Sequence, residues 1–158
     1  MAIEIERKFL VRDPSWQTAV TDRITIRQGY LATGHNATVR VRIGNERATL
    51  TIKSGGVGMA RAEYEYEIPV GDAGQMLDTL ALRPLIEKTR HRLRVAGHLW
   101  EIDVFAGDNA GLIVAEIELE SPDEVFAEPQ WLGAEITGDA RYYNSSLIEH
   151  PFGSWAKD

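Results

Sequence analysis

The chain has 158 residues, of which 44% are hydrophobic and 26% charged. This composition suits one folded domain over residues 1–158 and argues against a disordered or a transmembrane protein. Acidic residues outnumber basic ones by 24 to 17, and there is no cysteine. A broad basic face for nucleic acid is therefore not expected, and disulfides, thiolate zinc sites and cysteine nucleophiles are excluded. The first residues lack the apolar run of a signal peptide, so we expect a cytoplasmic protein.

Apolar and polar residues alternate along most of the chain, which predicts β-strands. Short connections such as Gly44-Asn45-Glu46 favour antiparallel pairing, and residues 54–58 are expected to form a longer flexible loop. About eight strands hide their edges best by closing into a barrel. The expected strands span residues 3–11, 24–31, 38–43, 48–53, 62–70, 85–95, 99–105 and 112–120.

Three helices are expected beside the strands. The segment 72–82 has an apolar side, and Ser121 is a favourable N-cap with Glu124 completing a capping box. A last helix over 139–149 ends before a proline. The predicted fold is thus dominated by β-structure (α+β): an eight-stranded antiparallel β-barrel with about three flanking helices.

Each expected strand has a charged face and an apolar face, because side chains two residues apart share a face. Alternation alone favours a barrel with an apolar lumen and a solvated outside. The alternative is an inverted barrel with a wet, charged lumen. Amphipathic helices that need an apolar surface favour this inversion. So do like charges that recur on one strand face, as in Arg40 and Arg42 or Glu116 and Glu118.

A charged lumen has a definite chemistry. Carboxylates without nearby histidine or cysteine suit hard divalent cations such as Mg²⁺ or Mn²⁺. Arginine and lysine suit phosphate oxygens. The four histidines do not have the spacing of a metal site. A lumen that carries both charge types fits a metal-chelated polyphosphate.

The opening of the chain, Glu4-Ile5-Glu6-Arg7-Lys8, matches the E-x-E-x-K signature of the CYTH superfamily, the triphosphate tunnel metalloenzymes, and residues 3–11 resemble its short bacterial members. Further matching motifs follow in order, so that the resemblance covers residues 3–147 and favours the charged lumen. They are Arg27-Gln28-Gly29-Tyr30-Leu31, Val39-Arg40-Val41-Arg42, Thr51-Ile52-Lys53, Glu63-Tyr64-Glu65, Glu87-Lys88-Thr89-Arg90, Glu101-Ile102-Asp103-Val104-Phe105, Glu116-Ile117-Glu118 and Arg141-Tyr142-Tyr143-Asn144.

The resemblance implies a barrel that forms a tunnel, in which a triphosphate binds together with a divalent metal. Matched position by position, the expected phosphate-binding residues are Lys8, Arg40, Arg42, Lys53, Lys88 and Arg90. The expected metal ligands are Glu4, Glu6, Asp103, Glu116 and Glu118. The expected catalytic residues are Lys8, Tyr30, Glu63 and Glu65.

The activity implied is hydrolysis of inorganic triphosphate to pyrophosphate and phosphate with Mg²⁺ or Mn²⁺, and nucleoside triphosphates are further expected substrates. Two alternatives stay open. An adenylate cyclase of the same superfamily needs a purine pocket, which the sequence does not identify. A polyphosphate- or nucleotide-binding module without turnover has no use for the carboxylates. We expect a small-molecule substrate, no nucleic acid or membrane partner, and a monomer or homodimer.

Overall fold

The computed structural model describes residues 2–55 and 59–155 of the chain. Most of the loop expected at 54–58 therefore lies outside the described residues. The strands are β1 Ala2–Val11, β2 Asp22–Ala32, β3 Ala37–Gly44, β4 Arg47–Ser54, β5 Ala60–Ile68, β6 Ile86–Val95, β7 His98–Phe105, β8 Ile113–Glu118 and β9 Leu132–Glu135. The α-helices are α1 Val70–Thr79 and α2 Asn144–Leu147, and short 3-10 helices span Pro14–Ala19, Gly107–Asn109, Ala140–Tyr142 and Phe152–Ser154.

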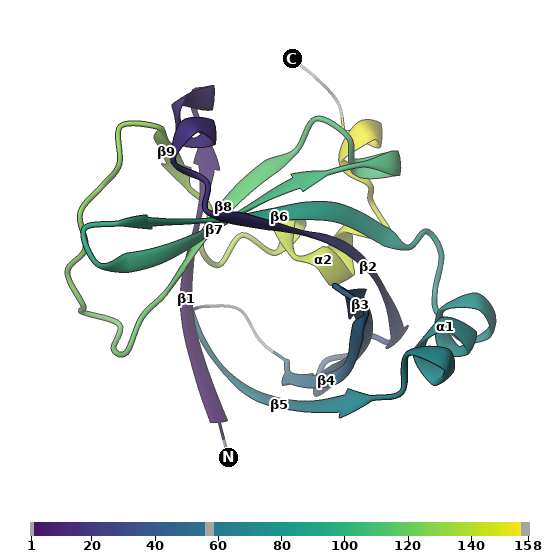
Figure 1. The fold of residues 1–158 in the computed structure, drawn as a ribbon. Coiled ribbons are helices and arrows are strands. Elements are labelled where there is room, and N and C mark those ends of the chain that lie inside the picture. Colours follow the sequence, from purple (N-terminus) through teal and green to yellow (C-terminus); the bar gives the residue numbers. More distant parts are fainter. Residues whose placement is uncertain (1, 56–58, 156–158) are drawn as a thin grey trace.

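Eight of these strands close into an antiparallel barrel, as predicted (Figure 1). Their order is β5-β4-β3-β2-β6-β7-β8-β1, and β1 also pairs with β5, which leaves no open edge between them. The ninth strand, β9, pairs with the C-terminal end of β1. It was not predicted from the sequence, because four residues are too few to show a period of two.

Most of the hydrophobic core lies on the outer face of the barrel wall. Trp100, Ile102 and Ile117 are completely buried beneath Trp16 of the first 3-10 helix and Trp131 of the long segment after β8. On the other side of the barrel, α1 covers the apolar faces of β3 and β4, and Figure 1 shows it outside the wall. The inverted arrangement, with apolar faces outside and charged faces inside, is therefore confirmed.

The lumen changes character along its length. Phe105 and Val114 lie opposite Lys88 and Asp103 in the strand register, so they share the inward face with these charged residues. Near this end the lining is apolar and packs against the C-terminal segment, where Leu147 is completely buried. The helix α2 thus lies across one end of the barrel (Figure 1), and the lumen is a cup with an apolar floor.

Two helix predictions need correction. Residues 121–124 form only a turn: the Glu124 carboxylate accepts from the Glu120 N–H at 2.6 Å, and Val125 is 88% exposed, so a helix here has no apolar side to bury. The helix expected over 139–149 is interrupted by Tyr143, whose ψ of 135° is extended and separates a 3-10 turn from α2. Within the described ranges, no helix combines the length and apolarity needed to cross a membrane.

Candidate active site

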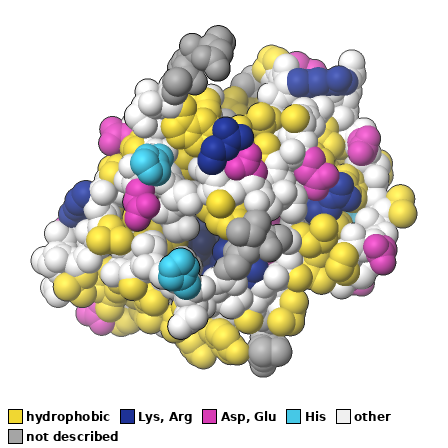
Figure 2. Space-filling view, turned by 180° about the vertical axis from the view of Figure 1, so that it is seen from behind, with side chains coloured by type: hydrophobic (Ala, Val, Ile, Leu, Met, Phe, Trp, Pro, Cys, Tyr) yellow, Lys and Arg dark blue, Asp and Glu magenta, His cyan; other side chains and the backbone are white. Residues whose placement is uncertain are grey.

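The lumen contains a cavity of about 370 Å³ lined almost entirely by polar side chains. Seven glutamates and eight lysines or arginines contribute to its described lining. Figure 2 shows a hollow near the centre of one face of the molecule, with Lys or Arg side chains in its depth. Burial of this many charges is costly unless a ligand or water compensates them. The cavity is therefore the candidate binding site of the molecule.

The barrel brings nearly all the predicted site residues to this cavity. Alternation explains the result, since each strand contributes residues spaced by two. Asp103 is the exception: it is 1% exposed and lies behind the lining, in contact with Lys88 and Arg90. The predicted residues that line the cavity are Glu4, Glu6, Lys8, Tyr30, Arg40, Arg42, Lys53, Glu63, Glu65, Lys88, Arg90, Glu116 and Glu118.

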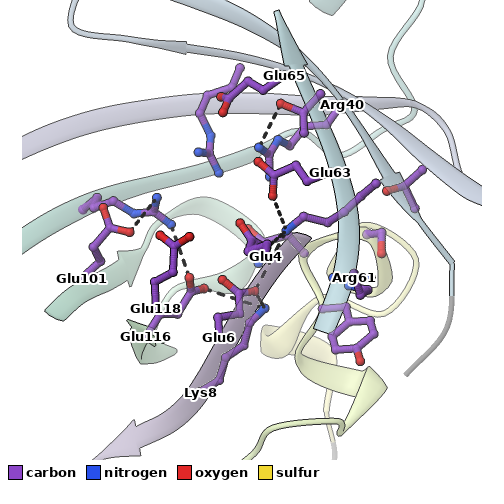
Figure 3. Close-up of a pocket in the computed structure, with 18 of the residues that line it drawn as sticks. Glu4, Glu6, Lys8, Arg40, Arg61, Glu63, Glu65, Glu101, Glu116 and Glu118 are labelled. Carbon is purple, nitrogen blue, oxygen red and sulfur yellow. Dashed lines mark hydrogen bonds and ion pairs between the residues drawn. The ribbon is translucent and has the colours of Figure 1, made fainter. Parts of the chain in front are cut away.

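One side of the cavity has more carboxylates than its cations can balance. The Lys53 Nζ lies 2.7 Å from Glu4 Oε1, 3.6 Å from Glu63 Oε2 and 4.0 Å from Glu6 Oε1 (Figure 3). One ammonium group is therefore shared by three acids. Burial and a hydrogen bond with Glu63 raise the pKa of Glu4.

Glu6 and Glu116 face each other across the Lys8 side chain. The Lys8 Nζ lies 3.6 Å from Glu6 Oε1 and 3.8 Å from Glu116 Oε1. Burial and the neighbouring Glu116 raise the pKa of Glu6 to about 7. Although burial disfavours its charged form, Lys8 and Arg90 lower the pKa of Glu116 to about 2. The pair therefore holds one firmly ionised and one easily protonated carboxylate.

Two further glutamates point into the same space without a cation of their own. Glu65 and Glu118 make no ion pair within 4.0 Å in the parts of the chain at 2–55 and 59–155, unlike Glu101, which pairs with Arg92 at 3.0 Å. Burial, Glu4 and Glu101 raise the pKa of Glu118. Figure 3 shows Glu118 beside Glu116, and Glu65 near Arg40. The negative charge is therefore unbalanced around Glu118, whereas Glu65 lies nearer the arginines.

The opposite side has unbalanced positive charge. Burial, together with Arg40 and Arg90, lowers the pKa of Arg42 to about 9. The Arg40 Nε is buried and has no hydrogen-bond partner among the described residues. A buried guanidinium N–H without an acceptor is costly. These arginines therefore point to an anionic ligand.

Lys88 and Arg90 are held from behind by Asp103. The Arg90 guanidinium donates two hydrogen bonds to Asp103, at 2.8 and 2.9 Å, and the Lys88 Nζ lies 2.7 Å from Asp103 Oδ2. Despite its burial, these cations keep the pKa of Asp103 well below its usual range. Burial lowers the pKa of Lys88 to about 7. Both carboxylate oxygens of Asp103 are thus already used by protein cations.

The carboxylate side of the cavity suits a divalent cation that keeps part of its hydration shell. No group of three acidic or histidine side chains within the described residues converges closely enough to hold a metal ion by itself. Mg²⁺ binds proteins through one or two carboxylates plus waters and substrate phosphates. Glu4, Glu6 and Glu118, whose ionised forms are disfavoured, supply such oxygens. The residues present therefore fit a metal that arrives with a phosphorylated ligand.

Several lining residues were missed from the sequence. Arg61 was missed because the fifth strand was expected to start at residue 62, although it shares the face of Glu63. Gln28 shares the face of Tyr30 on β2 but is completely buried behind the lining, where it accepts a hydrogen bond from Arg42. No periodicity places the residues of α2 in the cavity. Those not predicted are Thr38, Thr51, Arg61, Arg92, Glu101, Tyr143, Asn144 and Ser145.

Comparison with known proteins points to a single family. The sequence model of the CYTH domain matches residues 2–150. An inorganic triphosphatase of Acetivibrio thermocellus is 44% identical over 152 residues, which are 96% of this chain and 97% of that protein. An inorganic triphosphatase of Nitrosomonas europaea is 38% identical over 148 residues, 91% of this chain and 95% of that protein. The crystal structure of the inorganic triphosphatase NE1496 is 36% identical, covers 92% of this chain and 97% of its own, and gives a TM-score of 0.64. This chain belongs to the CYTH domain family.

Proposed function

We propose that this chain is a metal-dependent triphosphatase that cleaves inorganic triphosphate to pyrophosphate and phosphate. One observation carries the proposal. A single cavity has carboxylates on one side and cations on the other, and burial disfavours the charged forms of both. A metal-chelated triphosphate carries both of the charges needed to compensate the two sides. The names of the relatives at 44% and 38% identity support the same substrate.

The cationic side binds the phosphate chain. Arginine forks bind two phosphate oxygens at once, whereas a lysine acts as a point charge. Because these groups are fixed by strands on several sides of the barrel, they hold the substrate in line and stabilise the leaving pyrophosphate or phosphate. The proposed phosphate-binding residues are Lys8, Arg40, Arg42, Lys53, Lys88 and Arg90.

The carboxylate side holds the metal, for which we propose Mg²⁺ or Mn²⁺. When bound, the cation neutralises negative charge on the phosphoryl group that is transferred. Glu4, Glu6, Glu116 and Glu118 are the proposed ligands. Asp103 has no free oxygen for this role, so we assign it to orienting Lys88 and Arg90.

Proton transfer from the attacking water is assigned to Glu65. This carboxylate lines the cavity and makes no ion pair within the described ranges, so it is free to accept a proton. Glu63 is held by Lys53 and orients that lysine. Tyr30 lies opposite Arg40 in the β2–β3 register and is proposed to donate its O–H to a phosphate oxygen.

The test is phosphate release from triphosphate with Mg²⁺, with Mn²⁺ and with a chelator. We expect metal-dependent turnover that falls by about 10²-fold or more in Glu65→Gln, since general base catalysis contributes 10²–10⁴-fold. Glu67→Gln is the matched control, because Glu67 is on the same strand face but outside the cavity, where it pairs with the exposed Arg47 at 3.8 Å. Equal rates for the two variants contradict the assignment of Glu65.

The same assay separates the alternatives. ATP incubated under the same conditions gives cyclic AMP if the chain is a cyclase. In the described lining only Tyr30 and Tyr143 offer aromatic surface for a purine. Tight binding of triphosphate without any turnover identifies a binding module. Either result, without metal-dependent phosphate release, contradicts the proposed function.

A further inference from the structure

A half-buried amide from the C-terminal segment reaches the cationic side of the cavity. The Oδ1 atom of Asn144, the first residue of α2, accepts a hydrogen bond from Gln28 Nε2 at 2.9 Å and one from Lys88 Nζ at 2.8 Å. Gln28 is completely buried, and its Oε1 accepts from Arg42 Nε at 2.7 Å. Asn144 thus connects two of the proposed phosphate-binding residues, Lys88 directly and Arg42 through Gln28, although it is 56 residues from Lys88 and 116 residues from Gln28 along the chain.

The number of N–H donors on Lys88 explains what this contact does. An ammonium group has three donors. On Lys88 one is used by Asp103 at 2.7 Å and one by Asn144 at 2.8 Å. Lys88 is 3% exposed, yet it lines the cavity. Two fixed acceptors therefore limit the direction of the third N–H. The Phe105 ring, whose centroid lies 5.3 Å from Nζ, is only a weak acceptor, so this N–H is available to a ligand in the cavity.

The position of Asn144 is itself well fixed. The Tyr143 ring lies 5.4 Å from Lys8 Nζ and 4.8 Å from the Arg61 guanidinium carbon. Leu147, one turn later, is completely buried in the apolar floor of the cup. Further along, the Phe152 N–H donates to Asn109 Oδ1 at 2.8 Å. The amide oxygen is therefore presented by a segment that is anchored on both sides.

We propose that Asn144 is a positioning residue for triphosphate hydrolysis, whose amide oxygen holds Lys88 and Gln28 so that one N–H of Lys88 faces the phosphate chain. The inference rests on the proposed function. An amide suits the task because it accepts two hydrogen bonds without bringing a negative charge to the phosphate site. Neither alanine, which removes the acceptor, nor aspartate, which adds a charge, meets both requirements.

Kinetics of two substitutions test this role. For Asn144→Ala we expect kcat to fall about tenfold while KM changes less than about threefold, since a misaligned donor is felt mainly in the transition state. For Asn144→Asp we expect the reverse: both hydrogen bonds persist, but the added charge raises KM about tenfold with kcat nearly kept. Ser146→Ala is the control on the same helix, because Ser146 is not part of the described lining. Thermal unfolding verifies that each variant folds. If Asn144→Ala does not fold, Asn144→Asp still tests the role, because it keeps both hydrogen bonds.

A second measurement does not depend on turnover. The chain has only four lysines, so a spectrum of ¹⁵N-labelled lysine ammonium groups at mildly acidic pH is simple, and Lys88→Arg identifies the Lys88 signal. In the absence of triphosphate, we expect Asn144→Ala to shift or broaden this signal and Ser146→Ala to leave it in place. An unchanged Lys88 signal in Asn144→Ala, or a kcat equal to that of Ser146→Ala, overturns the inference. If the wild type does not hydrolyse triphosphate but the Lys88 signal depends on Asn144, the proposed function fails while the positioning of Lys88 is supported.

Discussion

Glu6 is the carboxylate whose ionisation conflicts most clearly with folding. It lies deep in the cavity, and burial and Glu116 raise its pKa from 4.5 to about 7. Lys8 and Lys53 oppose this rise but are shared with other acids. The folded, metal-free protein therefore favours the protonated form of Glu6 near neutral pH.

This predicts the pH dependence of stability. Between pH 4.5 and about 7 the folded state keeps a proton on Glu6 that the unfolded state releases, so the free energy of unfolding falls as the pH rises through this window. The contribution is fully present below 4.5 and amounts to at most about 3 kcal/mol. We expect that in Glu6→Gln the free energy of unfolding, measured with urea in the presence of a chelator, falls less steeply with rising pH. Glu4 and Glu118, whose pKa values are also raised, keep part of this decline.

The control for this measurement is Glu67→Gln, which removes a carboxylate from the exposed end of β5. Its stability profile is expected to follow that of the wild type. A Glu6→Gln profile as steep as the wild-type profile contradicts the assigned pKa. Addition of Mg²⁺ at neutral pH is expected to stabilise the wild type more than Glu6→Gln, because a cation binds the ionised carboxylate.

Most of the site residues that lie on a strand could be predicted from the sequence. Arg40 and Arg42 or Glu116 and Glu118 share a face because of the period of two, and this holds whatever the fold. Asn144 could not be found in this way. Its contacts join α2 to β2 and β6, and a short helix of four residues has no period that reveals which side chain turns inward.

The packing of β2 against α1 and the segment that follows this helix depends on a missing side chain. A Cβ atom on Gly29 comes within 2.8 Å of both Ala81 Cβ and Leu85 Cδ2, and within 3.0 Å of Leu77 Cδ2. At Gly74, inside α1, no heavy atom of the described residues lies within 4 Å of a Cβ added there, beyond the helix's own backbone and the chain neighbours. There is therefore no room for a side chain at Gly29, whereas there is room for one at Gly74.

We expect Gly29→Ala to destabilise the protein by about 1–3 kcal/mol, because the added methyl group forces α1 away from the barrel. Gly74→Ala is expected to stabilise it by about 0.5–1 kcal/mol, since alanine has less conformational freedom to lose in a helix. Chemical denaturation of the two variants and the wild type measures both effects. Equal stabilities would show that α1 packs less closely on Gly29 than its Cβ distances indicate.

The strands were predicted better than the helices, for a physical reason. The alternation that marks β3, for example, is imposed by a wall with two different faces, since Val41 and Ile43 pack beneath α1 whereas Arg40 and Arg42 line the cavity. The segment after Ser121 has favourable capping residues but no apolar side, and so it remains a turn. Capping residues can end or begin a helix, but the helix itself needs burial of a face to form.

The inverted barrel explains how a chain with net charge −7 can bind a polyanion. Its cations are concentrated in the lumen, whose walls have a low dielectric constant and so focus their field. The hydrophobic core is displaced to the outside, beneath α1 and the segment that carries Trp131. Stability and ligand binding are thereby divided between the two faces of the same strands.

Two adjacent residues of β3 test this division. Val41 is completely buried in the cluster with Ala73 and Leu77 of α1, whereas Arg42 lines the cavity. Val41→Asp places a charge in an apolar contact, at a cost of several kcal/mol that is comparable with the stability of a small domain. We expect this variant to have no cooperative unfolding transition.

Arg42→Leu is expected to fold, with a free energy of unfolding within about 1 kcal/mol of the wild type or above it. The substitution removes a buried cation whose pKa is lowered to about 9 and so relieves repulsion with Arg40 and Arg90, although Gln28 loses its donor. The KM for triphosphate is expected to rise about tenfold or more, because a charged hydrogen-bond donor to phosphate is lost. Thermal unfolding followed by circular dichroism and steady-state kinetics measure the two effects. A folded Val41→Asp together with an unfolded Arg42→Leu means that the strands face the opposite way.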